Sequence, residues 1–233
     1  MSQSKELKSH FTSLLKLPWT SDAIPGVIVE NVIALAYVGE VLDTYDFVDV
    51  IDPLQKIGWQ VKSTKENTPV TWKRAKIPNK QQLIDQSKVS EEGLQGLGDA
   101  ILDFCNEHAH ESLEKYDLSE IRYARCILLD SGRVKFFERT LCTTETPDIF
   151  DKQDFYWRWS KPKKTSKKEQ LPALHGLYRA DDSKAWAWHG HGENQLHFSG
   201  EQLWWSSNKL TNFEMDQPKK LSWNSFFEKM NRD

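Results

Sequence analysis

Apolar residues recur with helical spacing near the start of the chain. Residues 3–17 have the pattern of a short amphipathic helix. A second helix is predicted to begin at a cap on Ser21 or Asp22 and to run to about Leu42. The side chains of this second helix that we expect to be buried include Val27, Ile28, Leu35 and Val38.

Two more helices and a set of strands are predicted farther along the chain. Ser90 is expected to cap a long helix over about 91–116, and an amphipathic helix is expected near 222–230. Strand-like runs rich in β-branched and aromatic residues cover 45–52, 57–64 and 68–77, a hairpin over 120–141 that turns at 130–132, and short segments from Leu174 onward.

The order of these elements predicts a fold of the α/β or α+β class. We expect a central mixed β-sheet flanked by helices over residues 1–150. A β-rich C-terminal region over 151–233 is expected to complete the same domain, for DNA contact or dimerisation, rather than to fold independently. A chain of 233 residues is long enough to bury one substantial core.

Composition argues against a membrane protein. Hydrophobic residues make up 38% of the chain and charged residues 28%, as in ordinary globular proteins. The first residues lack the apolar stretch and cleavage site of a signal peptide. The most apolar window, 24–42, is interrupted by Glu30, Asn31 and Glu40, so we expect no membrane-spanning segment.

Three cysteines, Cys105, Cys126 and Cys142, are odd in number and widely spaced. This spacing matches neither a disulfide framework nor a zinc site. We therefore expect reduced, buried thiols in a cytoplasmic protein.

Charge is unevenly distributed, although the net charge is only −3. Residues 61–76 and 155–168 are rich in lysine and arginine, whereas residues 91–120 are rich in acids. This distribution suits a protein that holds a polyanion on one side, and it equally suits an ordinary solvated surface.

One predicted hairpin combines charged side chains with an alternating apolar pattern. If Asp52 pairs with Ile57 across its turn, then Asp49 lies opposite Gln60. Asp49, Gln60 and Lys62 then share one face of the hairpin. The residues expected on the opposite, packed face are Val48, Val50, Trp59 and Val61. A shift of register by one residue would separate the polar groups.

This hairpin resembles the active-site motif of the PD-(D/E)xK nuclease superfamily, which includes most type II restriction endonucleases. In that family an Asp is followed, farther along the chain, by an acid, one spacer and a Lys. Asp49 matches the first position, Gln60-Val61-Lys62 matches the second, and Glu30 matches a Glu often found on the preceding helix. Gln60 departs from the pattern, because an amide oxygen is a weaker Mg²⁺ ligand than a carboxylate. Some restriction enzymes of the superfamily carry Gln or Asn there.

The resemblance implies a type II restriction endonuclease that hydrolyses double-stranded DNA with Mg²⁺ and acts as a homodimer. Glu30 and Asp49 would hold the metal, with Gln60 as an auxiliary ligand. Lys62 would orient the attacking water and stabilise negative charge on the phosphate. Catalysis would then lie within residues 1–150.

Alternatives remain for the site and for the function. Asp46 and Asp52 compete with Asp49 for the first position of the motif. The loss of a carboxylate at Gln60 also suits a non-catalytic DNA-binding relative with a degraded site. A repair or phage nuclease acting on structured DNA is a third possibility.

Hydroxyl, amide and basic side chains in two segments are candidates for DNA contact. After the hairpin they are Ser63, Thr64, Lys65, Asn67, Thr71, Trp72, Lys73 and Arg74. In the second basic segment they are Arg158, Lys163 and Lys164. An exposed strand and a solvent-exposed loop would explain the same residues without DNA.

Aromatic and histidine residues concentrate in the C-terminal part. Trp186 and Trp188 alternate with alanines, so we expect them to pack on one face of a sheet rather than to stack on bases. His189, His191 and His197 lie near a turn and are open to three interpretations, namely a metal site, DNA contact or an ordinary polar turn.

Overall fold

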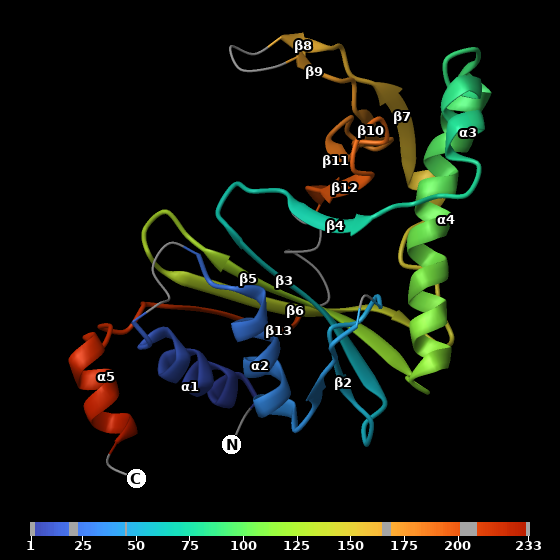
Figure 1. The fold of residues 1–233 in the computed structure, drawn as a ribbon. Helices are drawn as coiled ribbons and strands as arrows, with labels where there is room; N and C mark the ends of the chain where they lie inside the picture. The colour runs from blue at the N-terminus through green and yellow to red at the C-terminus, as the bar shows by residue number, and fades with distance from the viewer. Residues whose placement is uncertain (1–2, 19–22, 45, 165–168, 201–208, 232–233) are drawn as a thin grey trace. The chain divides into compact units, whose positions relative to one another are not determined.

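The computed structural model describes residues 3–18, 23–44, 46–164, 169–200 and 209–231 (Figure 1). In chain order its elements are α1 (Gln3–Leu15), α2 (Gly26–Tyr37), β1 (Glu40–Val41), β2 (Val50–Asp52), β3 (Ile57–Lys65), β4 (Val70–Arg74), α3 (Lys80–Gln86), α4 (Glu91–Lys115), β5 (Glu120–Leu128), β6 (Val134–Thr143), the 3-10 helix η1 (Lys152–Asp154), β7 (Phe155–Trp159), β8 (Lys163–Lys164), β9 (Glu169–Gln170), β10 (Leu174–Tyr178), β11 (Lys184–Trp188), β12 (Gln195–Phe198), β13 (Lys209–Met215) and α5 (Trp223–Met230). The fold is mixed α+β with a β-rich C-terminal part, as predicted.

The chain forms two compact units that alternate along the sequence. The first unit comprises Met1–Thr68, Glu111–Glu145 and Asn208–Asp233, and the second comprises Pro69–His110 and Thr146–Ser207. The units therefore do not divide at residue 150, where the sequence suggested a change of region. The C-terminal strand β13 belongs to the sheet of the first unit.

A six-stranded mixed sheet, in the order β1-β2-β3-β5-β6-β13, organises the first unit. Among the described strands, its only parallel pair is β3 with β5, which runs from Ile57 beside Glu120 to Lys65 beside Leu128. Helices α1 and α2 pack on one face of this sheet (Figure 1). The apolar core between them includes Phe11, Val32, Trp59, Val61 and Phe136.

Helix α2 is shorter than the apolar pattern predicted. Val38 adopts a left-handed conformation with a φ of 57°, and the N–H of Gly39 bonds to the carbonyl of Ala34, which ends the helix. Ile28 is buried as expected, but Val27 and Leu35 are more than half exposed, and so is Val38. The prediction for Val27 and Leu35 was wrong because apolar residues lie around most of α2 and only one side faces the sheet, and the prediction for Val38 was wrong because the helix ends before it.

A five-stranded antiparallel sheet, in the order β4-β12-β11-β10-β7, forms the second unit with α3 and residues 91–110 of α4. Ser90 caps α4 as predicted, because its hydroxyl accepts a hydrogen bond from the N–H of Gly93. Trp186 and Trp188 are fully buried in this sheet, which confirms that they pack on one of its faces. The packing is close, since a Cβ on Gly98 of α4 would lie 2.0 Å from the indole nitrogen of Trp157.

The structure also tests the predictions about the cysteines and about membrane-spanning segments. Cys105, Cys126 and Cys142 are all buried thiols that form no disulfide bond, as expected. Among the described residues, no helix is both long enough and apolar enough to cross a bilayer.

Candidate active site

The register of the β2–β3 hairpin is the one that the alternating pattern predicted. Asp52 pairs with Ile57, and Val50 pairs with Trp59. Trp59 and Val61 point into the core beneath α2, so Gln60 and Lys62 point to the opposite face of β3. One detail differs, because Val48 lies beside Gly58 rather than in that core. Strand β2 begins only at Val50, so the alternation does not extend back to Val48.

Strand β3 extends well beyond its partner β2, and this difference in length creates the site. Ladder pairs with β2 cover only Ile57 to Trp59, whereas β3 continues to Lys65. On its other side β3 pairs with β5 along its whole length. We call the β2-facing side of residues 60–65 the open edge of β3.

Asp49 occupies the beginning of this open edge. Its backbone N–H donates to the carbonyl of Trp59 at 2.8 Å, which continues the ladder by one bond. Its Oδ2 accepts a 2.7 Å hydrogen bond from the backbone N–H of Val61. The carboxylate therefore lies along β3, beside Gln60 and close to Lys62.

The two competing aspartates are engaged elsewhere. Asp46 accepts hydrogen bonds from Lys115, at 2.7 Å, and from the hydroxyl of Tyr116. These contacts lower the pKa of Asp46 to about 2. Asp52 is buried, and its carboxylate accepts hydrogen bonds from the N–H groups of Leu54 and Gln55 in the turn. Of the three, Asp49 alone is shown interacting with Glu30.

Glu30 reaches the same place from the first turns of α2. Burial raises the pKa of Glu30 most, the nearby charge of Asp49 raises it further, and Lys62 lowers it. The start of α2 is held at the open edge, because the Ser63 hydroxyl donates a 2.6 Å hydrogen bond to the carbonyl of Ile24. Glu30, Asp49 and Lys62 are thus close enough to interact electrostatically, although they come from three separate segments.

Gln60 lies on β3, two residues before Lys62, and is nearly inaccessible to solvent. Its side chain is only 2% exposed, and its Oε1 has no hydrogen-bond partner among the described residues. An unsatisfied buried amide oxygen is costly, by about 1–3 kcal/mol. Such an atom is stabilised when a cation or a donor binds to it.

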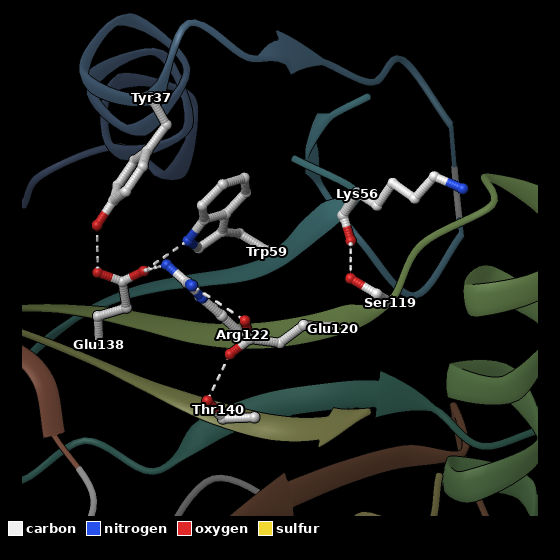
Figure 2. A network of polar contacts seen from close by, with 8 residues as sticks. All are labelled: Tyr37, Lys56, Trp59, Ser119, Glu120, Arg122, Glu138 and Thr140. Carbon is white, nitrogen blue, oxygen red and sulfur yellow. Dashed lines mark hydrogen bonds and ion pairs between the residues drawn. The ribbon is translucent and has the colours of Figure 1, made fainter. Parts of the chain in front are cut away.

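A buried polar network fixes α2 against β3 (Figure 2). Glu138 of β6 is fully buried and accepts hydrogen bonds from the hydroxyl of Tyr37, at 2.6 Å, and from the indole N–H of Trp59, at 2.8 Å. Arg122 of β5 pairs with the same carboxylate at 3.2 Å and with Glu120 at 3.0 Å. The network joins the helix that carries Glu30 to the strand that carries Lys62.

Sequence reasoning did not identify this network. Its members lie on four elements and are far apart in the chain, so no local spacing connects them. The one available signal is a charged residue, Glu138, that directly follows two buried phenylalanines in a strand.

The donor set suits a hard cation. Asp49 and Glu30 supply carboxylates, and Gln60 supplies an amide oxygen without a partner. Mg²⁺ prefers such oxygen ligands and commonly keeps several waters. Among the described residues, no group of three or more His, Cys, Asp or Glu side chains could hold a metal ion, and this set contains only two acids.

The residues predicted to contact DNA fall in both units. In the first unit Lys65 and Asn67 are exposed, and Ser63 and Thr64 are half-buried near the open edge. In the second unit Thr71, Arg74 and Arg158 are exposed on strands. Lys163 and Lys164 form β8, and their side chains lie outside the described part of the structure.

Two of these predictions need correction. Trp72 is 2% exposed and packs against Phe150 and Trp186, so its ring is not available to a ligand. The Nζ atom of Lys73 is also buried and interacts electrostatically with Cys105 of α4. Both residues face inward because β4 has a bulge at this point, between the pairs formed by Thr71 and Lys73.

The histidines of the second unit do not form a metal site with acids or cysteines among the described residues. His189 and His197 contact each other, with ring centroids 5.3 Å apart. His191 lies over the ring of Trp159.

Comparison with known proteins gave no relatives: no family model, no curated protein and no solved structure matches this chain.

Proposed function

We propose that this chain is a Mg²⁺-dependent endonuclease that hydrolyses double-stranded DNA, with the active site at the open edge of β3. The observation that carries the proposal is the 2.7 Å hydrogen bond from the Val61 N–H to Asp49, which holds this carboxylate beside Gln60 and near Lys62 and Glu30. Two carboxylates and a lysine in this arrangement match the PD-(D/E)xK motif that the hairpin resembles. Type II restriction is the activity that we favour within that class.

Each side chain has a distinct role in the proposed reaction. Asp49 and Glu30 would hold the Mg²⁺, with Gln60 as a neutral third ligand, and the bound cation would stabilise negative charge on the phosphate. Lys62 would orient the attacking water and add positive charge beside the phosphate. The water oxygen bonds to phosphorus and the P–O3′ bond breaks, which leaves a 5′-phosphate and a 3′-hydroxyl.

A homodimer is part of this proposal. Cutting both strands at a symmetric site calls for two equivalent active sites related by a two-fold axis. The oligomeric state is measured by light scattering with and without DNA. A chain that stays monomeric on DNA while it cuts both strands would contradict this part of the proposal.

A second candidate is a DNA-binding relative that no longer cuts. The observation in its favour is Gln60, because the site holds one negative charge fewer than a site with Glu at that position. Such a protein would bind DNA in a salt-sensitive manner and would leave it intact with Mg²⁺.

The test is incubation of the purified chain with varied unmethylated plasmid DNA, with and without Mg²⁺. We expect discrete fragments with Mg²⁺ and none in EDTA. Lys62→Ala is expected to slow cutting by about 100- to 1000-fold, as loss of one transition-state contact does. Lys56→Ala is the matched control, because Lys56 lies on the same hairpin but pairs with Asp117 at the surface.

The outcomes separate the two candidates. Equal activity in both lysine variants would show that Lys62 has no role in the reaction. Intact DNA in every condition, together with retained binding, would favour the non-catalytic relative.

A further inference from the structure

The five-stranded sheet of the second unit has one packed face and one open face. The packed face carries Trp157, Trp186, Trp188 and Phe198, all of them buried. Helix α4 covers this face, where Gln95 donates to the carbonyl of Phe155 and Gly98 lies against Trp157. The alternate residues of the same strands therefore lie on the opposite face, which we call the open face. Arg158 and Thr71 are exposed on this face, His175, Ala187 and His197 are half-buried, and Leu177 is buried.

A row of polar side chains crosses the open face from one edge strand to the other. The strand register places His175 beside Arg158 and Ala187, and His197 beside Ala187 and Thr71. The row therefore runs Arg158, His175, Ala187, His197, Thr71 across five strands. A neighbouring row contains His189, Gln195 and Arg74. Gln195 pairs with Arg74 across the strands, and its backbone carbonyl accepts a hydrogen bond from the N–H of His189.

The charge of the open face is positive or neutral throughout. Lys184 lies near both His189 and His197, since its charge affects each of them. In the described strands, none of the open-face positions is Asp or Glu. Two acids contact this face from the turns: Glu193 is 3.9 Å from Arg74, and Asp182 accepts a hydrogen bond from the hydroxyl of Tyr156. The face is basic although the whole chain has a net charge of −3.

We propose that this open face binds the phosphate backbone of duplex DNA. Guanidinium, ammonium, hydroxyl and imidazole groups are the donors that contact phosphate oxygens. Strands lie about 4.8 Å apart, so the row is about 19 Å long, the length of about six nucleotide steps of a duplex. Ala187 at its centre is small and allows a backbone to approach closely.

The position of the aromatic residues favours a duplex over a single strand. Single-stranded DNA is held mainly by bases that stack on exposed aromatic rings. In this sheet the rings of Trp157, Trp186 and Phe198 are buried on the packed face, and among the described open-face positions Tyr156 on the edge strand β7 is the one Tyr, Phe or Trp. The open face offers charged and hydrogen-bonding groups that suit phosphates.

Two histidines make this face sensitive to pH. Burial lowers the pKa of His189 and His197 most, and Lys184 lowers both further. Among the described residues, the groups that face His197 are Lys184 of β11, His189 directly after β11 and Thr71 of β4, none of which carries negative charge. A bound phosphate would stabilise the protonated imidazoles, so binding takes up protons and strengthens as the pH falls.

The test is fluorescence anisotropy with a labelled duplex in EDTA, where nothing is cut. We expect the double variant Arg158→Ala with His197→Ala to raise the Kd about tenfold or more and to reduce the salt dependence by about one phosphate contact. The control pairs Arg179→Ala with His108→Gln. Arg179 contacts Gln95 of α4 and His108 lies on α4 itself, so both are on the packed side.

Three results would overturn the inference: an unchanged Kd in the double variant, an equal loss in the control, or tighter binding of a single strand than of the duplex. A further variant, His189→Gln with His197→Gln, is expected to bind DNA with a weaker pH dependence between about pH 7 and pH 5, because the pKa of both imidazoles is lowered from 6.5 in the free chain. An undiminished pH dependence in that variant would overturn the role of the histidines.

The inference stands apart from the proposed hydrolysis. A chain that binds duplex DNA through this face but never cuts it would leave the inference intact and remove the nuclease proposal. A chain that still binds and cuts DNA with full affinity after the open-face substitutions would support the nuclease proposal and overturn the inference.

Discussion

The backbone N–H of Val61 donates a 2.7 Å hydrogen bond to Oδ2 of Asp49, so a carboxylate rather than a strand occupies the edge of β3 at this point. A paired strand would have covered the edge with main chain. A carboxylate satisfies the same donor and still has acceptor capacity, because its two oxygens offer about four lone-pair sites. This contact holds the side chain in place where Glu30 and Lys62 come close to it.

Glu30→Gln is expected to stabilise the metal-free chain at neutral pH while it impairs cleavage. The pKa of Glu30 in the folded chain is raised from 4.5, mainly by burial. Ionising it therefore costs folding free energy, and this cost appears as the pH rises above about 4.5. Urea unfolding in EDTA should show Glu30→Gln to be more stable than the wild type near pH 7 and equal to it below about pH 4. A less stable variant at neutral pH would contradict this account.

The same variant tests metal binding. Loss of groups that only support a metal ligand commonly weakens affinity 10- to 100-fold, so loss of a ligand should cost at least about tenfold. Isothermal titration with Mg²⁺ measures this directly. Glu40→Gln is a suitable control, because Glu40 is exposed on β1. Equal Mg²⁺ affinity in both variants would exclude Glu30 as a ligand.

Gln60→Glu is expected to lower the free energy of unfolding of the metal-free chain and to raise its affinity for Mg²⁺. Without metal, a third carboxylate buried near Asp49 and Glu30 should destabilise the chain by about 1–3 kcal/mol. With Mg²⁺, each tenfold gain in affinity should return about 1.4 kcal/mol. Thermal unfolding across a Mg²⁺ titration measures both effects. Gln60→Leu is the control that removes the oxygen, and it should show less Mg²⁺-linked stabilisation than the wild type.

Asp46→Asn is expected to reduce stability slightly and to leave cleavage unchanged. The hydrogen bonds from Lys115 and Tyr116 lower the pKa of Asp46 to about 2. The stabilisation is present above its ordinary pKa of 3.8 and is lost as the pH falls toward 2. Since the Lys115 side chain is 55% exposed, we expect a loss of only about 1 kcal/mol or less. Abolished cleavage in a folded Asp46→Asn chain would instead identify Asp46 as the catalytic acid.

Tyr37→Phe is expected to lower the free energy of unfolding by about 1–3 kcal/mol, because it leaves one oxygen of the buried Glu138 without its donor. Chemical denaturation at neutral pH measures this loss. Tyr156→Phe is the control, since its hydroxyl bonds to Asp182 at an exposed position. Equal losses in the two variants would show that the network in Figure 2 adds nothing beyond a surface contact.

The sequence predicted the parts of the site that depend on neighbouring residues. The turn and the period-two alternation were sufficient for the register of Asp52 with Ile57. The prediction stopped being correct at Val48, because the length of β2 depends on its pairing with β1 rather than on its own residues. The approach of Glu30 to Asp49 followed from a resemblance to a family motif and not from any spacing.

Long-range pairing accounts for what the sequence did not reveal. Strand β13 was not predicted, because its seven residues become a strand only beside β6, about seventy positions earlier in the chain. The buried acid Glu138 needs three partners from three other elements. Glu138 and Tyr37 are 101 positions apart, so no local sequence pattern includes both of them.

Strand β13 also governs when the first unit can be completed during protein synthesis. Its Phe213 packs against Phe11 of the first helix and Phe136 of β6, so it belongs to the same core as the elements around the site. A chain still on the ribosome acquires Asp49 and Lys62 early, but it lacks this outer strand until after residue 215 has emerged. Assembly of this sheet and its core is therefore delayed until residue 215 has been translated, long after the residues of the site.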